Sequence, residues 1–273
     1  MPEAVNAQTN HGIYSRWVNI DFSSKRMPAY MAWPDRDGPW PAVIVLMEIF
    51  GVNSHIRSVV DRLAAEGYVA IAPNYYHRTA ENLELGYSER DIATGRQHKE
   101  KTTREGIISD MRAVIQFLQI DQNVSPKDRM GCVGFCFGGH VAYIAASMKE
   151  IVATASFYGA GIATESPGGG AATITHTREI QGEMLCLFGE KDASIPHEQT
   201  VAIDQALRDA NVRHEVIRYA NTAHGFFCDQ RDSYDPSAAE DAWLRLKALF
   251  HEELQVAQSP NMTLISQPTY PKG

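Results

Sequence analysis

The sequence predicts an α/β fold in which a mostly parallel central sheet carries helices on both faces. Short apolar runs alternate with amphipathic stretches along most of the chain, and this alternation is typical of a parallel sheet with both faces covered. The run Ala42–Met47 is apolar at every position, as expected of a strand buried on both sides. A length of 273 residues suits one large domain of this class, and we expect that domain to occupy residues 1–255.

The boundaries of the elements follow from the apolar runs and from the residues that interrupt them. After two opening strands in residues 13–33, strands are expected at 42–47, 68–72, 129–134, 152–158, 184–188 and 214–219. Helices are expected at 54–66, 104–119, 198–210 and 238–254, and a further helix begins near Phe137. Gly67 closes the first helix and Pro73 ends the strand after it, because these residue types interrupt regular structure.

Three segments depart from the alternation. Residues 77–103 are polar and highly charged, with too few apolar positions for a strand of the sheet, so we expect a small cap or lid above the sheet there. Gly168–Gly170 predicts a flexible loop. Residues 256–273 hold three prolines and are expected to form a tail along the surface.

The composition excludes several classes of function. A hydrophobic content of 44% with 21% charged residues indicates a globular chain. The 33 acidic and 25 basic residues give a net charge of −8, which argues against nucleic acid and anionic membranes as general partners. No apolar run approaches the roughly 18 residues that a membrane span requires, and the first residues lack the features of a signal peptide. We therefore expect a cytoplasmic protein, either a monomer or a homodimer.

The four cysteines are consistent with a cytoplasmic protein. None forms a CxxC pair or a spacing typical of zinc ligands, so no metal site is expected. Cys132 and Cys186 lie in apolar runs, where a reduced cysteine behaves as a small hydrophobic residue.

Cys136 lies in a motif of a different kind. The segment Gly134-Phe-Cys-Phe-Gly-Gly139 directly follows a predicted strand and directly precedes a predicted helix. It matches the G-x-S-x-G nucleophile elbow of α/β-hydrolases, with sulfur in place of oxygen. Glycines allow the tight turn, and the helix N-terminus favours a thiolate. The same turn directs the backbone N–H of Phe137 toward a developing oxyanion.

Two other interpretations of this motif have to be weighed. A glycine-rich turn between strand and helix can instead bind a phosphate, but glycines at 134, 138 and 139 do not fit G-x-G-x-x-G. Cys136 can also be a structural thiol, which is the usual role of a lone cysteine. The rest of the chain decides between these interpretations.

An acid and a histidine follow in the order that the hydrolase interpretation requires. Asp192 comes just after the predicted strand 184–188, and His224 comes just after the strand 214–219. Both lie at carboxyl ends of parallel strands, at the edge that also carries Cys136. Nucleophile, acid and histidine in this order define the triad of α/β-hydrolases, so we predict that His224 activates the thiol and that Asp192 orients the imidazole.

Four stretches of the chain resemble the dienelactone hydrolase family, the carboxymethylenebutenolidases. They are MEIFGVNSHIRSVVDRLAAEGYVAIAPNYYHR at 47–78, GFCFGG at 134–139, GEKDASIP at 189–196 and AHGFF at 223–227. The resemblance covers roughly residues 13–255. It implies hydrolysis of lactones or related esters by a Cys-His-Asp triad, with neither a metal nor an organic cofactor.

The resemblance also assigns a role to Glu48 and to the residue that follows it. The matching glutamate of the family lies beside the nucleophilic thiol and helps to take its proton. A neighbouring carboxylate disfavours a second negative charge, so the resting thiol would stay protonated and protected from oxidation. The backbone N–H of Ile49 matches the position that completes the oxyanion hole with Phe137.

The substrate-binding residues are less well defined. Family members that act on dienelactone hold its carboxylate with two arginines, one from the cap and one four residues beyond the histidine. Here the second position is Cys228, and the nearest arginine is Arg231. The other candidates, none of which the spacing aligns with the family, are Arg78, Arg90, Arg96, Tyr76 and Tyr87.

Three hypotheses for the function therefore stand after the sequence analysis. The first is a cysteine hydrolase of small anionic lactones or esters, acting through a thioester acyl-enzyme. The second, motivated by Cys228 in place of arginine, is a broad carboxylesterase with the same triad and no requirement for a substrate carboxylate. The third is a non-catalytic ligand-binding or redox-sensing protein, against which the intact triad argues.

Overall fold

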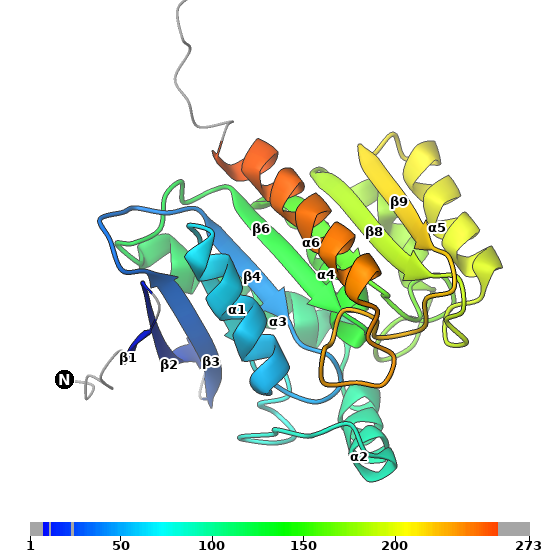
Figure 1. Ribbon diagram of the computed structural model, residues 1–273, viewed down its shortest axis with the longest axis horizontal. Helices are drawn as coiled ribbons and strands as arrows, with labels where there is room; N and C mark the ends of the chain where they lie inside the picture. Colours follow the sequence, from blue (N-terminus) through cyan, green and yellow to red (C-terminus); the bar gives the residue numbers. More distant parts are fainter. Residues whose placement is uncertain (1–7, 11, 23–24, 256–273) are drawn as a thin grey trace, which may run out of the picture.

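The centre of the molecule is a twisted sheet whose strands are mostly parallel (Figure 1). The computed structural model describes residues 8–10, 12–22 and 25–255, and over these residues the sheet has nine strands in the order β1-β2-β3-β5-β4-β6-β7-β8-β9. The strands are β1 Gln8–Asn10, β2 Ile13–Phe22, β3 Lys25–Pro34, β4 Ala42–Leu46, β5 Val69–Pro73, β6 Met130–Phe135, β7 Ile151–Phe157, β8 Glu183–Gly189 and β9 His214–Tyr219. Strands β1 to β3 pair antiparallel, and β3 pairs antiparallel with β5. From β5 to β9 every pairing is parallel.

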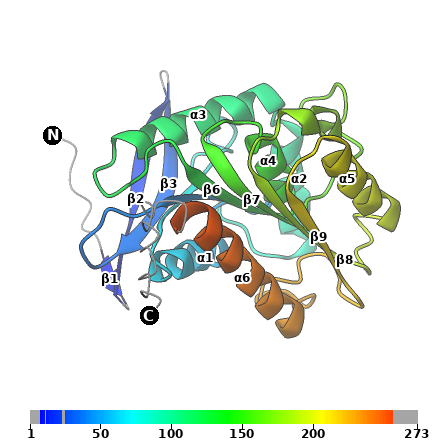
Figure 2. The same cartoon turned by 90° about the horizontal axis from the view of Figure 1, so that it is seen from above.

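Helices cover both faces of this sheet. They are α1 Ser54–Ala65, α2 Glu89–Glu100, α3 Arg104–Ile120, α4 Phe137–Ala145, α5 His197–Asp209 and α6 Pro236–Phe250, with a 3-10 helix at Thr173–Glu179 and a π turn at His251–Gln255. Helices α1 and α6 lie on one face, and α3 and α4 lie on the other (Figure 2). Helix α2 stands apart, beyond the ends of the central strands (Figure 1).

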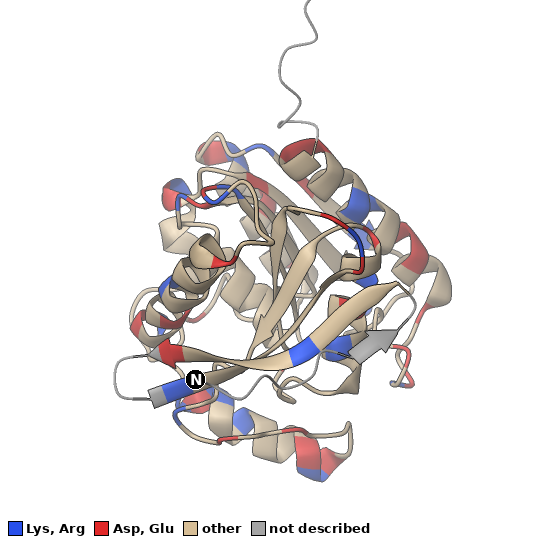
Figure 3. Cartoon of the chain, turned by 90° about the vertical axis from the view of Figure 1, so that its left-hand side faces the viewer, with Lys and Arg blue, Asp and Glu red and all other residues tan. Residues whose placement is uncertain are grey.

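The core lies between the central strands and these helices. All residues of β4, β5 and β6 are buried, which is the reason for their continuous apolar sequences. The charged residues lie mainly on helices and connecting loops, where acidic and basic residues alternate (Figure 3). In the part of the chain that the structure describes, no helix combines the length and apolar character needed to cross a bilayer.

The predicted elements are confirmed, with small shifts at their ends. The strand expected at 68–72, for example, is β5 at Val69–Pro73, and the helix expected at 238–254 is α6 at Pro236–Phe250 followed by a π turn. Helix α2, the 3-10 helix and the short strand β1 were not expected. Helix α2 has one buried residue, Gly95, so its sequence carries no apolar stripe from which a helix is predicted. The tail expected at 256–273 lies outside the described residues.

Candidate active site

Cys136 occupies a strained turn between β6 and α4. Its backbone has φ 55° and ψ −118°, a conformation that residues with a side chain rarely adopt and that typically costs about 1–3 kcal/mol. Strain of this kind persists only where the surrounding structure enforces it. Here the amide N–H of Cys136 donates to the carbonyl of Phe157 at 3.0 Å, and its carbonyl accepts from Gly139 N at 2.9 Å.

Two glycines of the motif make this turn possible. A Cβ on Gly138 would lie 2.2 Å from the carbonyl oxygen of Leu46, and a Cβ on Gly134 would lie 1.9 Å from that of Gly138. The first turn of α4 therefore crosses the ends of β4 and β6 at backbone contact, which only glycine permits. This close crossing places Cys136 at the carboxyl edge of the sheet.

His224 and Asp192 meet at the same edge. Nδ1 of His224 donates to Oδ2 of Asp192 across 2.6 Å. The Asp192 side chain is 0% exposed, and its Oδ1 also accepts from the backbone N–H of Ser194 at 2.8 Å. These two contacts fix the carboxylate, and the carboxylate in turn fixes the imidazole so that Nε2 is left to act on another group.

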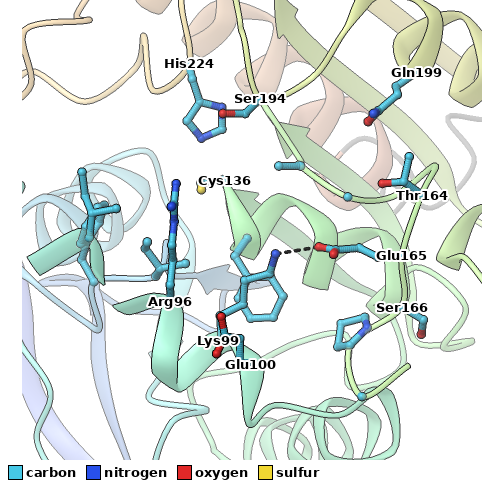
Figure 4. A pocket seen from close by; sticks show the side chains of 18 of the residues that line it. Arg96, Lys99, Glu100, Cys136, Thr164, Glu165, Ser166, Ser194, Gln199 and His224 are labelled. Carbon is cyan, nitrogen blue, oxygen red and sulfur yellow. Dashed lines mark hydrogen bonds and ion pairs between the residues drawn. The ribbon is translucent and has the colours of Figure 1, made fainter. Parts of the chain in front are cut away.

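The electrostatics of His224 favour its charged form. Burial lowers the pKa of this imidazole, but the charge of Cys136 and the hydrogen bonds with Asp192 and Cys136 outweigh burial and raise the pKa to about 10. Figure 4 shows the His224 ring beside the sulfur of Cys136. The imidazole is therefore held in its charged form between the carboxylate of Asp192 and the sulfur of Cys136.

Glu48 follows β4 at the same edge and is paired with an arginine. Its side chain is 1% exposed, and its Oε1 lies 3.0 Å from Nη1 of Arg231. Its second oxygen, Oε2, is buried with no hydrogen-bond partner among the described residues. Burial lowers the pKa of Arg231, but the charges of Glu48 and Cys136 outweigh it, so the net shift is upward and the guanidinium stays charged.

A cavity of about 630 Å³ opens above Cys136. Cys136 and His224 lie side by side in its lining (Figure 4), which also includes Phe137 and Ile49. On the opposite side, Lys99 of α2 forms an ion pair with Glu165 at 2.6 Å. The lining further includes Phe50, Ile92, Arg96, Glu100, Ala160, Gly161, Thr164, Ser166, Pro167, Gly168, Ser194, Gln199 and Arg231. The cavity thus combines an apolar floor with charged groups of both signs.

Of the six side chains suggested for substrate binding, the structure brings two to this cavity. Arg96 and Arg231 line it. Arg78 instead holds Asp110 through two hydrogen bonds, of 2.5 and 2.6 Å. The others, Arg90, Tyr76 and Tyr87, lie outside the lining; Tyr76 is buried, and the hydroxyl of Tyr87 accepts from Asn53 and from the thiol of Cys228.

Several lining residues were missed by the sequence analysis. Lys99, Glu165 and Gln199 lie in unrelated parts of the chain. Their sequence neighbourhoods contain no motif, and they meet only because α2 folds back over the loop after β7. A charged residue on an exposed helix is usually solvated, so no local signal distinguishes Lys99 from its neighbours.

The parallel sheet, the elbow and the residues at its edge define the class: the chain is an α/β-hydrolase. The model of the dienelactone hydrolase family matches residues 27–254. A protein of Synechocystis sp. named "Putative carboxymethylenebutenolidase" is 48% identical over 238 residues, which cover 87% of this chain and 96% of that protein. A protein of the same name from Escherichia coli K12 is 34% identical over 88% of each chain. The chain therefore belongs to the dienelactone hydrolase family and is a hydrolase.

Solved structures agree with this assignment. The crystal structure of a "Putative Dienelactone Hydrolase" from Klebsiella pneumoniae has a TM-score of 0.80 at 32% identity, covering 88% of this chain and 99% of that one. The dienelactone hydrolase-like phosphotriesterase P91 has a TM-score of 0.74 at 23% identity, over 89% of this chain and 99% of its own. At that identity the second likeness supports the fold alone.

Proposed function

We propose that this protein hydrolyses small lactones or esters that carry an anionic group, with Cys136 as the nucleophile. The observation that carries the proposal is the meeting of Cys136 and the hydrogen-bonded His224–Asp192 pair at the floor of one cavity. The family to which the chain belongs and the names of its relatives support the same reaction.

The reaction proceeds in two halves. The Sγ of Cys136, having given its proton to His224, attacks the carbonyl carbon of the substrate, and a tetrahedral intermediate forms. The C–O bond then breaks, the leaving oxygen takes the proton from His224, and an acyl thioester remains on Cys136. In the second half, His224 removes a proton from water and the water oxygen attacks the thioester carbon. The S–C bond then breaks, the acid is released, and the sulfur of Cys136 takes the proton back from His224.

Each half of the reaction passes through a tetrahedral intermediate with a negatively charged oxygen. In this proposal the backbone N–H groups of Phe137 and Ile49 stabilise that oxyanion. Phe137 is the first residue of α4, so its amide lies at the positive end of a helix dipole. Ile49 lies in the turn after β4 and lines the cavity. Donors of this kind contribute roughly 3–4 kcal/mol of transition-state stabilisation each.

Glu48 and Arg231 couple the chemistry to substrate binding. In the structure the two side chains neutralise each other, so one oxygen of the Glu48 carboxylate is occupied by Arg231. A substrate carboxylate that attracts Arg231 would weaken this ion pair and leave Glu48 free to assist His224 in taking the proton of Cys136. Arg96, whose guanidinium points to the side of the cavity that holds Cys136 (Figure 4), would hold the same anionic group from the cap.

The placement of Arg231 supports a substrate carboxylate even though the family position four residues after the histidine is Cys228. We propose that Arg231 takes over the role of the missing arginine. We also propose that residues 77–103, which include α2, act as the cap over this cavity, since Arg96 and Lys99 of α2 line it.

A broad carboxylesterase is the second candidate. The observation in its favour is that Glu48 already balances the charge of Arg231, so a neutral ester can enter without leaving an unpaired arginine. A pair of substrates that differ only by a free carboxylate separates the two candidates. The anionic substrate should show a kcat/KM at least about 10-fold higher, and Arg231→Met should remove that preference. Equal kcat/KM values for the two substrates would assign the carboxylesterase.

A further inference from the structure

A second cluster of ionisable side chains includes the Glu48 carboxylate. It consists of Glu48 after β4, His55 in the first turn of α1 and Cys228 in the loop that follows His224. The ligand atoms of the three residues all lie within 4.8 Å of one another, and all three side chains are buried. A carboxylate oxygen, an imidazole nitrogen and a thiol sulfur so close together form a donor set for a metal ion.

Two atoms of this cluster lack the partners that buried polar atoms normally have. Among the described residues, Oε2 of Glu48 and Nε2 of His55 are buried without a hydrogen bond. Buried polar atoms are nearly always paired, so two orphans in one cluster point to a missing ligand. The His55 ring is held edge-on by Phe135 and Phe227, at 5.9 and 6.1 Å between ring centroids.

The thiol of Cys228 donates a hydrogen bond to the hydroxyl of Tyr87 at 3.2 Å. An incoming dication would displace that proton to solvent and convert the thiol to a thiolate ligand.

We infer that Glu48, His55 and Cys228 form a binding site for a zinc-like divalent cation. Mixed oxygen, nitrogen and sulfur ligands select zinc over calcium and magnesium, which prefer oxygen alone. Zinc bonds of 2.0–2.3 Å in a tetrahedral arrangement separate the ligands by about 3.4–3.7 Å, so the three side chains need to close in by only about an ångström. A water molecule would complete the shell.

The cluster also has a route to solvent. His55 lines a second cavity of about 350 Å³, on whose wall Asp229 and Glu240 lie together with Arg62. This cavity is separate from the one above Cys136, with no lining residue in common. Since His55 borders this cavity, a path for an ion that avoids the substrate cavity would pass beside its imidazole.

Occupancy of this site would inhibit the enzyme. This consequence, unlike the metal site itself, rests on the proposed function, in which Glu48 assists His224 in taking the proton of Cys136. A metal bound to Glu48 withdraws that carboxylate from Cys136. The dication, the Glu48 carboxylate and the Cys228 thiolate together are neutral, so Arg231 loses the counterion that holds it in place. Both effects lower the rate, and a chelator reverses them.

The metal site is tested by titrating the full-length protein with Zn²⁺ in a calorimeter and with Co²⁺ in a spectrophotometer. Wild type should bind one equivalent, and Co²⁺ should give a thiolate-to-metal charge-transfer band. Cys228→Ser and His55→Gln should each weaken Zn²⁺ binding by at least about 100-fold, more than the loss of an outer-shell partner causes, and Cys228→Ser should abolish the band. Circular dichroism confirms that each variant is folded.

The matched control is Cys136→Ser, because Cys136 and His224 form a competing pair of metal ligands. If the inference is correct, this variant binds Zn²⁺ as wild type does. Loss of binding in Cys136→Ser with retention in both Cys228→Ser and His55→Gln would overturn it, as would no binding to wild type. Inhibition is measured with an ester substrate: Zn²⁺ should inhibit wild type at the concentrations where it binds and should not inhibit Cys228→Ser. Binding without inhibition would leave the metal site standing and contradict the role of Glu48 in the proposed function.

Discussion

The two walls of the substrate cavity are built by different physical means. The sheet-edge wall, which carries Cys136 and the imidazole of His224 that Asp192 holds, rests on the fully buried strand β6 and on a turn at backbone contact. The cap wall rests on α2, which buries a single residue and reaches the loop after β7 through the ion pair of Lys99 with Glu165. The proposed reacting residues therefore lie on a rigid support, the sheet edge. The proposed cap residues lie on α2, which is less firmly held.

The largest effect is expected on the sheet-edge wall. His224→Ala removes the proposed base and acid, so kcat/KM for an ester substrate should fall by about 10⁴-fold. The fold should persist, because the ring lies on the wall of the cavity. The control is Arg90→Ala on α2, outside the cavity lining, which should keep the wild-type rate. A His224→Ala enzyme with more than a tenth of that rate would break the distinction between the walls.

The contact between the walls is tested at Gly95. A Cβ at this position would lie 2.4 Å from the carbonyl oxygen of Ile49, so Gly95→Ala should displace α2 or the turn that carries the Ile49 amide. A displacement of about 1 Å typically costs up to 10²-fold in rate, and we expect kcat to fall by about 10- to 100-fold. Ala93→Val adds bulk on the exposed side of the same helix and should change kcat by less than about twofold. Equal effects of the two substitutions would show that the close contact is unimportant.

The charge of His224 should appear in the dependence of stability on pH. The pKa of His224 is raised from the ordinary value of 6.5 to about 10. Because the folded protein holds this proton more tightly than the unfolded chain does, protonation of His224 stabilises the fold. The contribution is fully present below pH 6.5 and is lost as the pH rises through 10. Wild type should therefore lose thermal stability between about pH 6.5 and 10 relative to His224→Gln, in Tm measurements on both proteins. Parallel Tm curves over this range would contradict the raised pKa of His224.

The smallest effect is expected at the ion pair of the cap. Lys99 and Glu165 are partly exposed, and pairs of this kind contribute roughly 0–1 kcal/mol. Lys99→Met and Glu165→Gln should each raise KM by no more than about fivefold and leave kcat nearly unchanged. If the pair acts as a unit, the double variant should resemble either single one. A large loss of kcat in either variant would show that this ion pair contributes to the chemical step.

The residues of the sheet-edge wall could be predicted one by one from the sequence, whereas for the cap wall the sequence predicted only an excursion at 77–103 and Arg96 as one of several candidates. Cys136 directly follows the buried strand β6, and Asp192 and His224 come shortly after β8 and β9, so the order of strands along the chain brings the three residues to one edge. Helix α2 has no apolar stripe, and neither the helix nor the position of Arg96 on the cavity can be derived from periodicity.

Contacts between residues far apart in the chain also could not be predicted from the sequence. Arg231 and Glu48 are 183 positions apart, and no local pattern indicates their ion pair. The same holds for His55 and Cys228, which meet Glu48 only in the folded chain. The expectation that the chain holds no metal site rested on cysteine spacing, which is informative only for ligands that lie close in sequence.

The central claim, that Cys136 is the nucleophile, is tested most directly by trapping the acyl-enzyme. An activated ester is mixed with the enzyme, the reaction is quenched in acid within the first turnover, and the peptides are analysed by mass spectrometry. We expect the peptide that contains Cys136 to be heavier by the mass of the acyl group. Hydroxylamine should remove this group, as it does from a thioester, and the group should be absent in Cys136→Ala. An acyl group on another residue, or undiminished turnover by Cys136→Ala, would contradict the proposed mechanism.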